Sequence, residues 1–263
     1  MELASFALQI EARPDFYDYS PVMNGSVEWH VNFADAQLFG FYGGGLFAQD
    51  EMQVAEHPVL ASVREVMDLQ DSAFTEKNGK ACPVLVMGAE RRCRFDLRPN
   101  PAAGLPHGMY GNSFAHAPTE AIRAVTTILD SPATSNIIAM AAPGGNYGLY
   151  SKSEIKRILL TAFTAFHGAV IVSGDCPTVI HSGWWGCGAF GGNRLLMALL
   201  QMAAANMAGI RRLVFHAGNA DGVQQLDEAK SLAESLLKIP LKSESFFNHV
   251  EALGFEWGMS NGT

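Results

Sequence analysis

Two adjacent acids, Asp50 and Glu51, stand shortly after three successive glycines, Gly43, Gly44 and Gly45. A glycine run costs much conformational entropy to order, so a fold keeps it mainly where the backbone must approach another group closely. A phosphate or a sugar is such a group. The acids are expected in the first turn of a helix beside this loop. A phosphate-sized cradle next to a carboxylate indicates glycosidic chemistry on a nucleotide-like substrate.

A second glycine-rich segment spans residues 183–192, between an expected strand at 178–180 and an expected helix at 193–208. This layout places free backbone N–H groups and the positive end of a helix dipole at one point, which suits a phosphate without any lysine. The segment matches neither a Walker A loop nor a GxGxxG fingerprint. Each loop alone is equally well explained as a tight turn, but two in one domain favour a ligand that lies between them.

The hydrophobic pattern predicts strands that alternate with helices. Strands are expected at residues 27–34, 83–87, 136–140, 170–172, 178–180 and 212–216. Helices are expected at 49–69 with an interruption at Pro58, at 120–129, from the caps Ser151 or Ser153 to about 166, at 193–208 and at 221–237. Several runs are fully apolar, which is typical of strands buried on both faces. The alternation, with a long loop at 97–118, favours one α/β domain.

Composition limits the possible functions. The chain has 263 residues and a formal net charge of −8. This acidic balance argues against non-specific nucleic-acid binding, which needs a basic surface, so no direct DNA binding is expected. The four cysteines show no CxxC spacing and are interpreted as reduced thiols rather than as a disulfide or zinc framework.

The N-terminus carries an acid and no basic region, so it does not resemble a signal peptide. We see no uninterrupted apolar run of the ~18 residues that span a bilayer. The expectation is a soluble, cytoplasmic protein, or a nuclear one if the source is eukaryotic, without a membrane partner.

A series of motifs runs in order through residues 27–217. Its members are Val31-Asn-Phe-Ala-Asp35, the glycines 43–45, Gln49-Asp-Glu-Met52, His57-Pro-Val-Leu60, residues 84–91, Ile137-Ile-Ala-Met140, Ser153-Glu-Ile-Lys-Arg157 and the glycine-rich segment 183–192. In content and order the series resembles the poly(ADP-ribose) glycohydrolase family. The resemblance implies a macrodomain-like three-layer α/β/α sandwich with a mixed central sheet. It implies a single catalytic domain over residues 1–263, with the N-terminal ~25 residues as an accessory strand and loop segment.

The same resemblance implies a glycosidase that cleaves the ribose–ribose O-glycosidic bond of poly(ADP-ribose), with no cofactor and no metal. The substrate would carry ADP-ribose, as a polymer or on a modified protein. Glu51 corresponds to the catalytic acid–base, and Asp50 to the acid beside it. The implied substrate-binding residues are Glu11, Asp35, Gly43, Gly44, Gly45, Gln49, Gly186, Cys187, Gly188, Ala189 and Phe190.

The resemblance assigns each part of ADP-ribose to a different motif. Glu11 would bond the adenine amino group, the glycines 43–45 would wrap the distal ribose and its phosphate, and residues 186–190 would give N–H groups to the diphosphate. Adjacent helical residues point about 100° apart, so Asp50 and Glu51 cannot flank one bond from opposite faces. One acid–base residue with an orienting neighbour fits this spacing better than a standard glycosidase pair.

Four positions depart from the family pattern. Asp35 and Trp184 each stand where the family has Asn, Asp50 is a shortened Glu, and Ala217 stands where relatives often place an aromatic residue. The substrate could therefore differ, and two alternatives stay open: a mono-ADP-ribosyl hydrolase and a non-catalytic ADP-ribose-binding macrodomain.

A third alternative comes from another class of enzyme. Cys187 with His181 as its base would make a cysteine hydrolase, which needs the two side chains within hydrogen-bond reach. A small buried thiol is the better interpretation of Cys187. The remaining histidines show no metal-ligand spacing, and Trp184 and Trp185 are expected either to stack on the ligand or to pack in the core.

Overall fold

A mixed six-stranded sheet forms the centre of the fold. The computed structural model, which describes residues 8–144, 147–236, 239–240 and 243–260, orders the strands as β1 (Gln9–Arg13), β8 (Arg212–His216), β7 (Thr178–Gly183), β2 (Val27–Ala34), β6 (Thr126–Ala141) and β5 (Val84–Phe95). Neighbouring strands are parallel from β1 to β6, and β5 pairs antiparallel with β6. The mixed central sheet expected from the sequence is confirmed.

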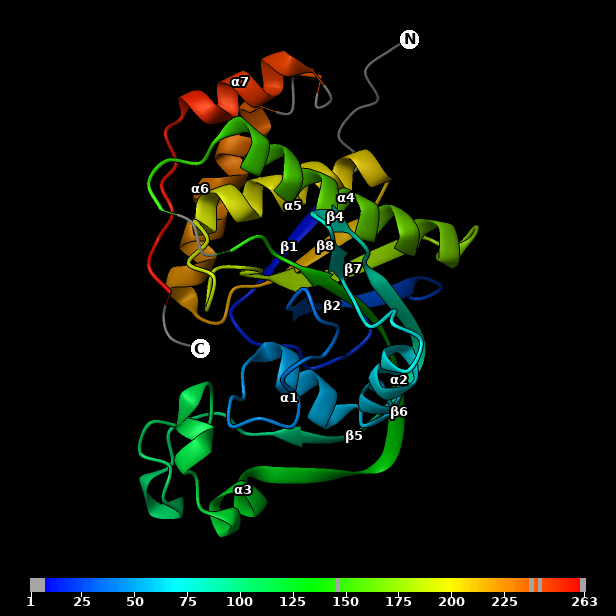
Figure 1. Cartoon of the computed structure of the whole chain (residues 1–263), viewed down its shortest axis with the longest axis vertical. Helices are drawn as coiled ribbons and strands as arrows, with labels where there is room; N and C mark the ends of the chain where they lie inside the picture. The colour runs from blue at the N-terminus through cyan, green and yellow to red at the C-terminus, as the bar shows by residue number, and fades with distance from the viewer. Residues whose placement is uncertain (1–7, 145–146, 237–238, 241–242, 261–263) are drawn as a thin grey trace.

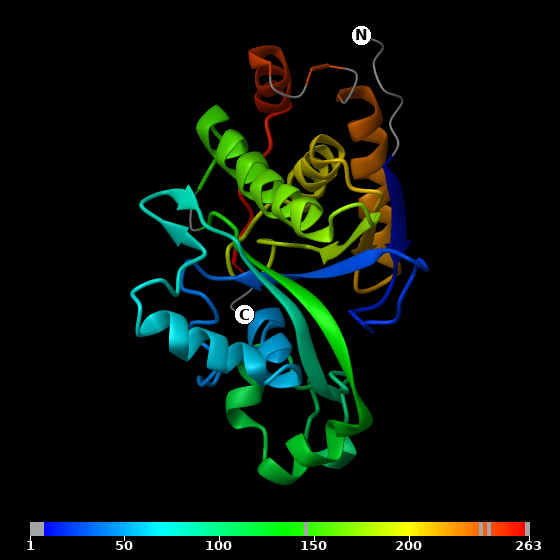
Figure 2. The same cartoon turned by 90° about the vertical axis from the view of Figure 1, so that its right-hand side faces the viewer.

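Helices cover both faces of this sheet (Figure 1 and Figure 2). One face carries α4 (Lys152–Ser173), α5 (Arg194–Ala208) and α6 (Ala220–Leu236), with α7 (Glu244–Ala252) packed on α4 and α6. The other face carries α1 (Gln49–Glu56) and α2 (Val59–Asp68). The predicted three-layer α/β/α arrangement is thus confirmed.

Smaller elements lie around these layers. The short α3 (Thr119–Val125) and the 3-10 helices η1 (Pro101–Ala103) and η2 (Asn112–His116) gather at the far end of the β5–β6 hairpin (Figure 1). The two-residue strands β3 (Glu76–Lys77) and β4 (Lys80–Ala81) pair with each other. The first described segment, expected to be accessory, supplies β1 to the edge of the central sheet.

The core lies on both faces of the sheet because strand residues alternate in direction. In β6, Ile138 and Met140 join the cluster under α4 and α5, whereas Ile137 and Ala139 join the cluster under α1 and α2. All four side chains are fully buried. A strand covered on both faces is typically a continuous apolar run, as residues 137–140 of β6 are.

Capping residues set where the helices near the site begin. Ser151 caps α4, and its backbone N–H donates to the Glu154 carboxylate at 2.7 Å. Asn193 caps α5 by accepting from the Leu196 N–H at 3.2 Å. Both devices satisfy N–H groups that have no partner in the first helical turn. The start of α5 directly after the glycine-rich segment is therefore fixed by its own cap.

Two predicted elements are wrong. The helix expected at 120–129 ends at Val125, because Thr126 and the following residues continue as β6 and pair with β5 from Phe95 backwards. The strand expected at 170–172 is the last turn of α4, where Ala169 packs in the core while Ile171 and Val172 face outward. At 126–129 the β-branched residues Thr126, Thr127 and Ile128 follow their strand preference once β5 offers a partner, whereas at 170–172 the packing of α4 overrides it.

Helix α4 bears on the expectation of no membrane-length segment. By length and composition alone it is apolar enough to cross a bilayer. In this fold it packs against the sheet, α5 and α7, with Ile155, Ile158 and Phe166 fully buried.

A buried ion pair joins α1 to the sheet. Arg91 on β5 donates from Nε and Nη2 to the two carboxylate oxygens of Glu56, each at 3.0 Å, and both side chains are at least nine-tenths buried. The guanidinium also lies 4.2 Å from the centre of the Tyr19 ring. A planar fork on a carboxylate is the strongest geometry for such a pair. It fixes the C-terminal end of α1, whose first turn carries the two acids.

Replacing Arg91 by Met should lower the free energy of unfolding by about 3–5 kcal/mol, because the buried Glu56 then loses its partner. Glu56→Gln combined with Arg91→Met should recover part of that loss. Urea denaturation of the single and double variants measures both. Arg92→Met, which removes the exposed neighbour paired with Glu90, is the matched control and should cost under about 1 kcal/mol. Equal losses in the Arg91 and Arg92 variants would contradict this role.

Candidate active site

A cavity of about 360 Å³ opens at the carboxyl ends of β2, β7 and β8. Phe33 from β2, Ser182 and Gly183 from β7, and His216 from β8 form part of its wall. Open α/β sheets characteristically bind ligands outside the carboxyl ends of their strands. The volume lies in the range of pockets that hold small ligands.

The cavity exists because β2 and β7 part before they end. Their pairing runs only from Val27 to His30 on β2. Beyond that point the side chain of Gln49 replaces the missing strand as hydrogen-bond partner of β2. Its Nε2 donates to the Val31 carbonyl at 3.0 Å, and its Oε1 accepts from the Phe33 N–H at 2.7 Å. The Tyr17 hydroxyl lies 3.1 Å from both the Val31 and the His181 carbonyl. Buried backbone groups need such partners once a ladder ends.

Gln49 therefore fixes the start of α1 against the open end of β2. Asp50 and Glu51 follow in the first turn, and both line the cavity although they are 6% and 4% exposed. The Asp50 carboxylate accepts from Asn32 Nδ2 at 3.0 Å. The Glu51 carboxylate accepts from the Ala48 N–H at 3.0 Å. The two acids are thus held by different partners.

Burial changes the acidity of both carboxyl groups. It raises the pKa of Asp50 to about 7, and the negative charge of Glu51 adds to the rise against the hydrogen bond from Asn32. Burial also raises the pKa of Glu51 above its usual value, although backbone N–H groups oppose the change. A carboxyl group that keeps its proton near neutral pH is able to act as a general acid.

The glycine-rich segment forms the opposite wall. Gly186, Cys187, Gly188, Ala189 and Phe190 all line the cavity. In the described part of the chain, the N–H groups of Gly188, Ala189 and Phe190 have no hydrogen-bond partner, whereas the Cys187 N–H donates to the Trp184 carbonyl at 3.0 Å. The three free N–H groups and the nearby N-terminus of α5 make a place for an anion.

Close packing requires glycine in this wall. Gly186 has φ +75°, and a Cβ there would lie 2.6 Å from the Ala142 side chain. A larger residue would displace the segment from the cavity.

The aromatic and cationic wall residues lie beside the same segment. Trp184 is partly buried, lines the cavity and donates from its indole N–H to the Ala217 carbonyl at 3.0 Å. Trp185 is fully buried and donates to the Met140 carbonyl at 3.0 Å. Arg194 lies 5.0 Å from the Trp184 ring centre. Among the described residues that line the cavity, Arg194 is the only Lys or Arg. The acidic residues in the same lining are Asp35, Asp50 and Glu51.

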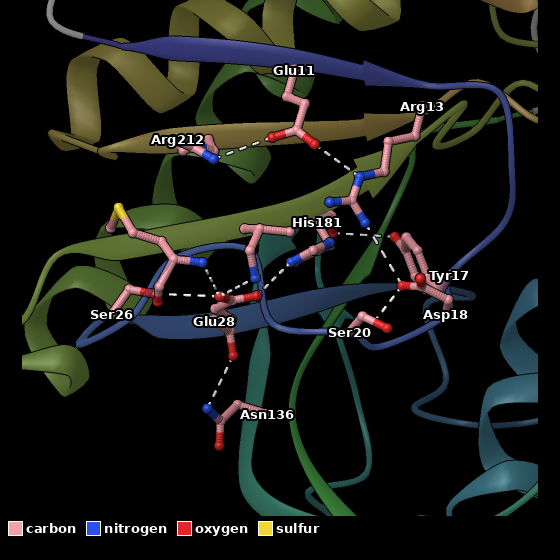
Figure 3. A network of polar contacts seen from close by, with 12 residues as sticks. Glu11, Arg13, Tyr17, Asp18, Ser20, Ser26, Glu28, Asn136, His181 and Arg212 are labelled. Atoms are coloured by element: carbon pink, nitrogen blue, oxygen red, sulfur yellow. Dashed lines mark hydrogen bonds and ion pairs between the residues drawn. The ribbon is translucent and has the colours of Figure 1, made fainter.

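Some predicted site residues lie outside the cavity wall. The glycines 43–45 are exposed, and only their neighbours Phe41 and Leu46 line the cavity. Glu11 does not line it either: its carboxylate pairs with Arg13 at 2.9 Å and with Arg212 at 3.2 Å (Figure 3). Asp35 does line it and accepts from the Gln37 N–H at 3.0 Å.

The alternative of a cysteine hydrolase is contradicted. Burial raises the pKa of the Cys187 thiol to about 12, so the reactive thiolate is scarce. Both ring nitrogens of His181 are engaged elsewhere, by Glu28 at 2.9 Å and by His216 at 3.1 Å.

Among the residues that the structure describes, no group of three or more His, Cys, Asp or Glu side chains has the arrangement of a metal site.

Sequence reasoning missed several wall residues. Phe16 and Tyr17 follow β1, Tyr110 belongs to the loop 97–118, and His216 ends β8. The long loop was itself a signal, because such loops in compact domains are often functional. No local pattern marks the other three, since the fold alone brings the ends of β1 and β8 to the cavity.

Asp50→Asn should change how stability depends on pH. The folded protein holds the Asp50 proton up to about pH 7, whereas an unfolded Asp loses it near pH 3.9. The folded state therefore binds more protons between these values, and the stability contributed by Asp50 falls as pH rises through that window. Asn keeps an oxygen for Asn32 but does not titrate. From pH 5 to pH 8 the wild type should lose about 2–3 kcal/mol relative to the variant in urea denaturation.

The control for this experiment is Asp130→Asn, at an exposed position on β6. It should leave the pH dependence of the wild type unchanged. A wild type and Asp50→Asn with parallel pH profiles would show that Asp50 ionises normally.

Comparison with known proteins places this geometry in context. Residues 106–225 match the family model described as poly(ADP-ribose) glycohydrolase (PARG), macro domain fold. No curated protein sequence matches the chain. Among solved structures, a poly(ADP-ribose) glycohydrolase from Thermomonospora curvata bound to the inhibitor ADP-HPD shares 16% identity at a TM-score of 0.55, covering 84% of this chain and 78% of that one.

A second solved structure agrees with the first. The poly(ADP-ribose) glycohydrolase from Deinococcus radiodurans in complex with ADP-ribose shares 14% identity at a TM-score of 0.51, covering 88% of this chain and 86% of that one. At such identities the likeness to solved structures shows the fold. The resemblance of the chain to the poly(ADP-ribose) glycohydrolases is thus confirmed, by the family model over residues 106–225 and by a macrodomain-like fold.

Proposed function

We propose that the protein is a glycosidase of the poly(ADP-ribose) glycohydrolase type, which hydrolyses the ribose–ribose bond of poly(ADP-ribose) and releases ADP-ribose. The observation that carries this proposal is one cavity with two opposed walls. One wall presents two buried carboxyl groups of raised pKa, and the other presents three free N–H groups. Solved relatives of the same fold that bind ADP-ribose or ADP-HPD support it.

The order of the strands suggests how the ligand lies. The free N–H groups follow β7, the acids lie beside the end of β2, and β8 flanks β7 on the other side. Neighbouring strands are about 4.8 Å apart, so the three points are spread along the sheet edge. ADP-ribose has its diphosphate between the adenosine and the distal ribose. With the diphosphate at residues 188–190, the distal ribose reaches Asp50 and Glu51, and the adenosine lies toward β8.

Glu51 is the acid–base residue in this proposal. Its protonated carboxyl group donates to the ribose oxygen that leaves, while the bond from that oxygen to the anomeric carbon of the distal ribose breaks. The resulting carboxylate accepts a proton from water as the water oxygen bonds to the anomeric carbon. The Ala48 N–H holds the Glu51 carboxylate throughout.

Asp50 has a different part. It points to Asn32 on β2 and stands about 100° around the helix from Glu51, so it orients the distal ribose rather than sharing the proton transfer. The free N–H groups at residues 188–190 carry the diphosphate charge. Preorganised dipoles of this kind cost no rearrangement during the reaction.

Incubation with purified poly(ADP-ribose) tests the proposal. The wild type should release ADP-ribose, and Glu51→Gln should lower kcat by about 10²–10⁴-fold, as expected when a general acid is lost. Calorimetry should show that Glu51→Gln still binds ADP-ribose within a few-fold of the wild type. Glu228→Gln, an exposed change on α6, is the control and should keep full activity.

The other outcomes separate the remaining candidates. No release from polymer, with release from a mono-ADP-ribosylated protein, would replace polymer cleavage by mono-ADP-ribosyl hydrolysis. ADP-ribose binding without turnover of either substrate would indicate a binding module. Full activity of Glu51→Gln would refute Glu51 as the acid.

A further inference from the structure

A second cavity, of about 550 Å³, adjoins the first one. Phe16, Tyr17, Met52 and Tyr110 line both cavities, so these side chains form the border between them. Met52 directly follows Glu51 on α1. The second cavity therefore begins beside the acid to which the proposed function assigns proton transfer.

Tyr110 lies where this border meets the acid. Burial raises the pKa of its hydroxyl, a hydrogen bond with the Gln49 backbone opposes the rise, and the negative charge of Glu51 adds to it. The hydroxyl is therefore close to the first turn of α1. From Met52 the second cavity extends to Glu56, which lies one helical turn and about 5–6 Å further along α1. The second cavity thus leads away from the space in which ADP-ribose is proposed to bind.

One positive charge in the wall of the second cavity has no partner. The three acids of this wall each pair with an arginine: Asp18 with Arg13 at 3.7 Å (Figure 3), Glu56 with Arg91 at 3.0 Å and Asp96 with Arg98 at 2.6 Å. Arg94 lines the same wall, is exposed, and makes no side-chain hydrogen bond or ion pair with another described residue. Its guanidinium is free to bind an anion, and the planar fork of donors suits phosphate oxygens.

An exposed aromatic ring stands at the border of the two cavities. Phe16 is 56% exposed, and its ring centre lies 6.4 Å from that of Tyr110 at an interplanar angle of 20°. A flat nucleobase can stack on such a ring whatever its identity, because every base has a π-face. One base–aromatic stack contributes about 5- to 150-fold in affinity.

The chemistry of the proposed cleavage identifies a ligand with these two features. The ribose oxygen that leaves belongs to the adenosine of the next ADP-ribose unit in the polymer. An adenine base and then a diphosphate therefore follow directly after the bond that breaks. The wall shows the same order, since Phe16 borders both cavities whereas Arg94 lines only the second one.

We propose that the second cavity holds the leaving ADP-ribose unit of the polymer, with its adenine stacked on Phe16 and its diphosphate at Arg94. The inference rests on the proposed function, in which Glu51 protonates the oxygen of that unit. ADP-ribose alone has a single diphosphate, which binds at residues 188–190 in the first cavity.

This assignment favours one class of substrate. A mono-ADP-ribosylated protein has an amino-acid side chain as its leaving group, which carries neither a base for Phe16 nor a phosphate for Arg94. The polymer carries both. The second cavity thus makes the polymer a better substrate than a mono-ADP-ribosyl adduct.

The experiment measures binding in Glu51→Gln, so that the ligand is not consumed. Calorimetry gives the dissociation constants of ADP-ribose and of its dimer, in which the same unit still carries its leaving unit. The dimer should bind about 10-fold or more tightly than ADP-ribose. Two units competing for one site would by themselves give no more than about twofold.

Two further variants in the Glu51→Gln background test the assigned residues. Phe16→Leu should remove most of the preference for the dimer. Arg94→Gln should lower the preference several-fold and make binding of the dimer less sensitive to salt, because a phosphate contact is lost. Arg123→Gln, an exposed change on α3, is the matched control and should keep the preference. Binding of ADP-ribose by each variant shows that it is folded.

The outcomes separate this inference from the proposed function. Binding of neither ligand by wild type and Glu51→Gln would refute the proposed function and the second cavity with it. Binding of ADP-ribose, with a dimer that binds no more tightly, would refute only the role of the second cavity. A preference for the dimer that survives both Phe16→Leu and Arg94→Gln would also refute that role alone.

Discussion

The structure of the site depends on the point where β2 and β7 separate. Past His30 the two strands no longer pair, and the side chains of Gln49 and Tyr17 satisfy the backbone groups that are released. Gln49 is also the first residue of α1, so the bond that closes the open strand positions the two acids that follow it. Without these hydrogen bonds from side chains in place of the bonds between strands, buried N–H and C=O groups would remain unpaired. The separation itself provides the space for a ligand.

The proposed function requires an acidic protein to hold an anionic ligand. The chain carries a net charge of −8, and three acids line the cavity against one arginine. Burial raises the pKa of Asp50 to about 7, which reduces the negative charge of this carboxyl group near neutral pH, and it raises the pKa of Glu51 above its usual value. The three free N–H groups of residues 188–190 attract a phosphate without any added side-chain charge. In the proposed function, the raised pKa of Glu51 suits the proton that this residue donates.

Much of the fold could be predicted from local patterns. The strands at 27–34 and 212–216, the break between α1 and α2 at Pro58, and the start of α4 at one of the expected caps, Ser151, follow from alternation, apolar runs and capping chemistry. The boundaries that failed are set by long-range contacts. The second half of the expected helix 120–129 is a strand because β5 offers it a pairing partner, which no window of sequence reveals.

The site was predictable where a motif is contiguous. Asp50, Glu51, Gln49 and residues 186–190 line the cavity, as Asp35 does. Glu11 and the glycines 43–45 do not, because a motif fixes residue types but not the direction in which an edge strand or an exposed loop faces. The chain from Glu28 through His181 to His216 was invisible, since its members are separated by more than 30 residues at each step and meet only when β2, β7 and β8 lie side by side.

A crystal structure of the protein with ADP-ribose tests the central claim most directly. The account predicts the diphosphate on the N–H groups of Gly188, Ala189 and Phe190, the distal ribose within hydrogen-bond reach of Glu51, and the adenosine beside the end of β8. A second cavity, lined by Arg91, Arg94 and Arg98, offers the main alternative place for an anion. Diphosphate bound there, or a distal ribose remote from α1, would contradict the account.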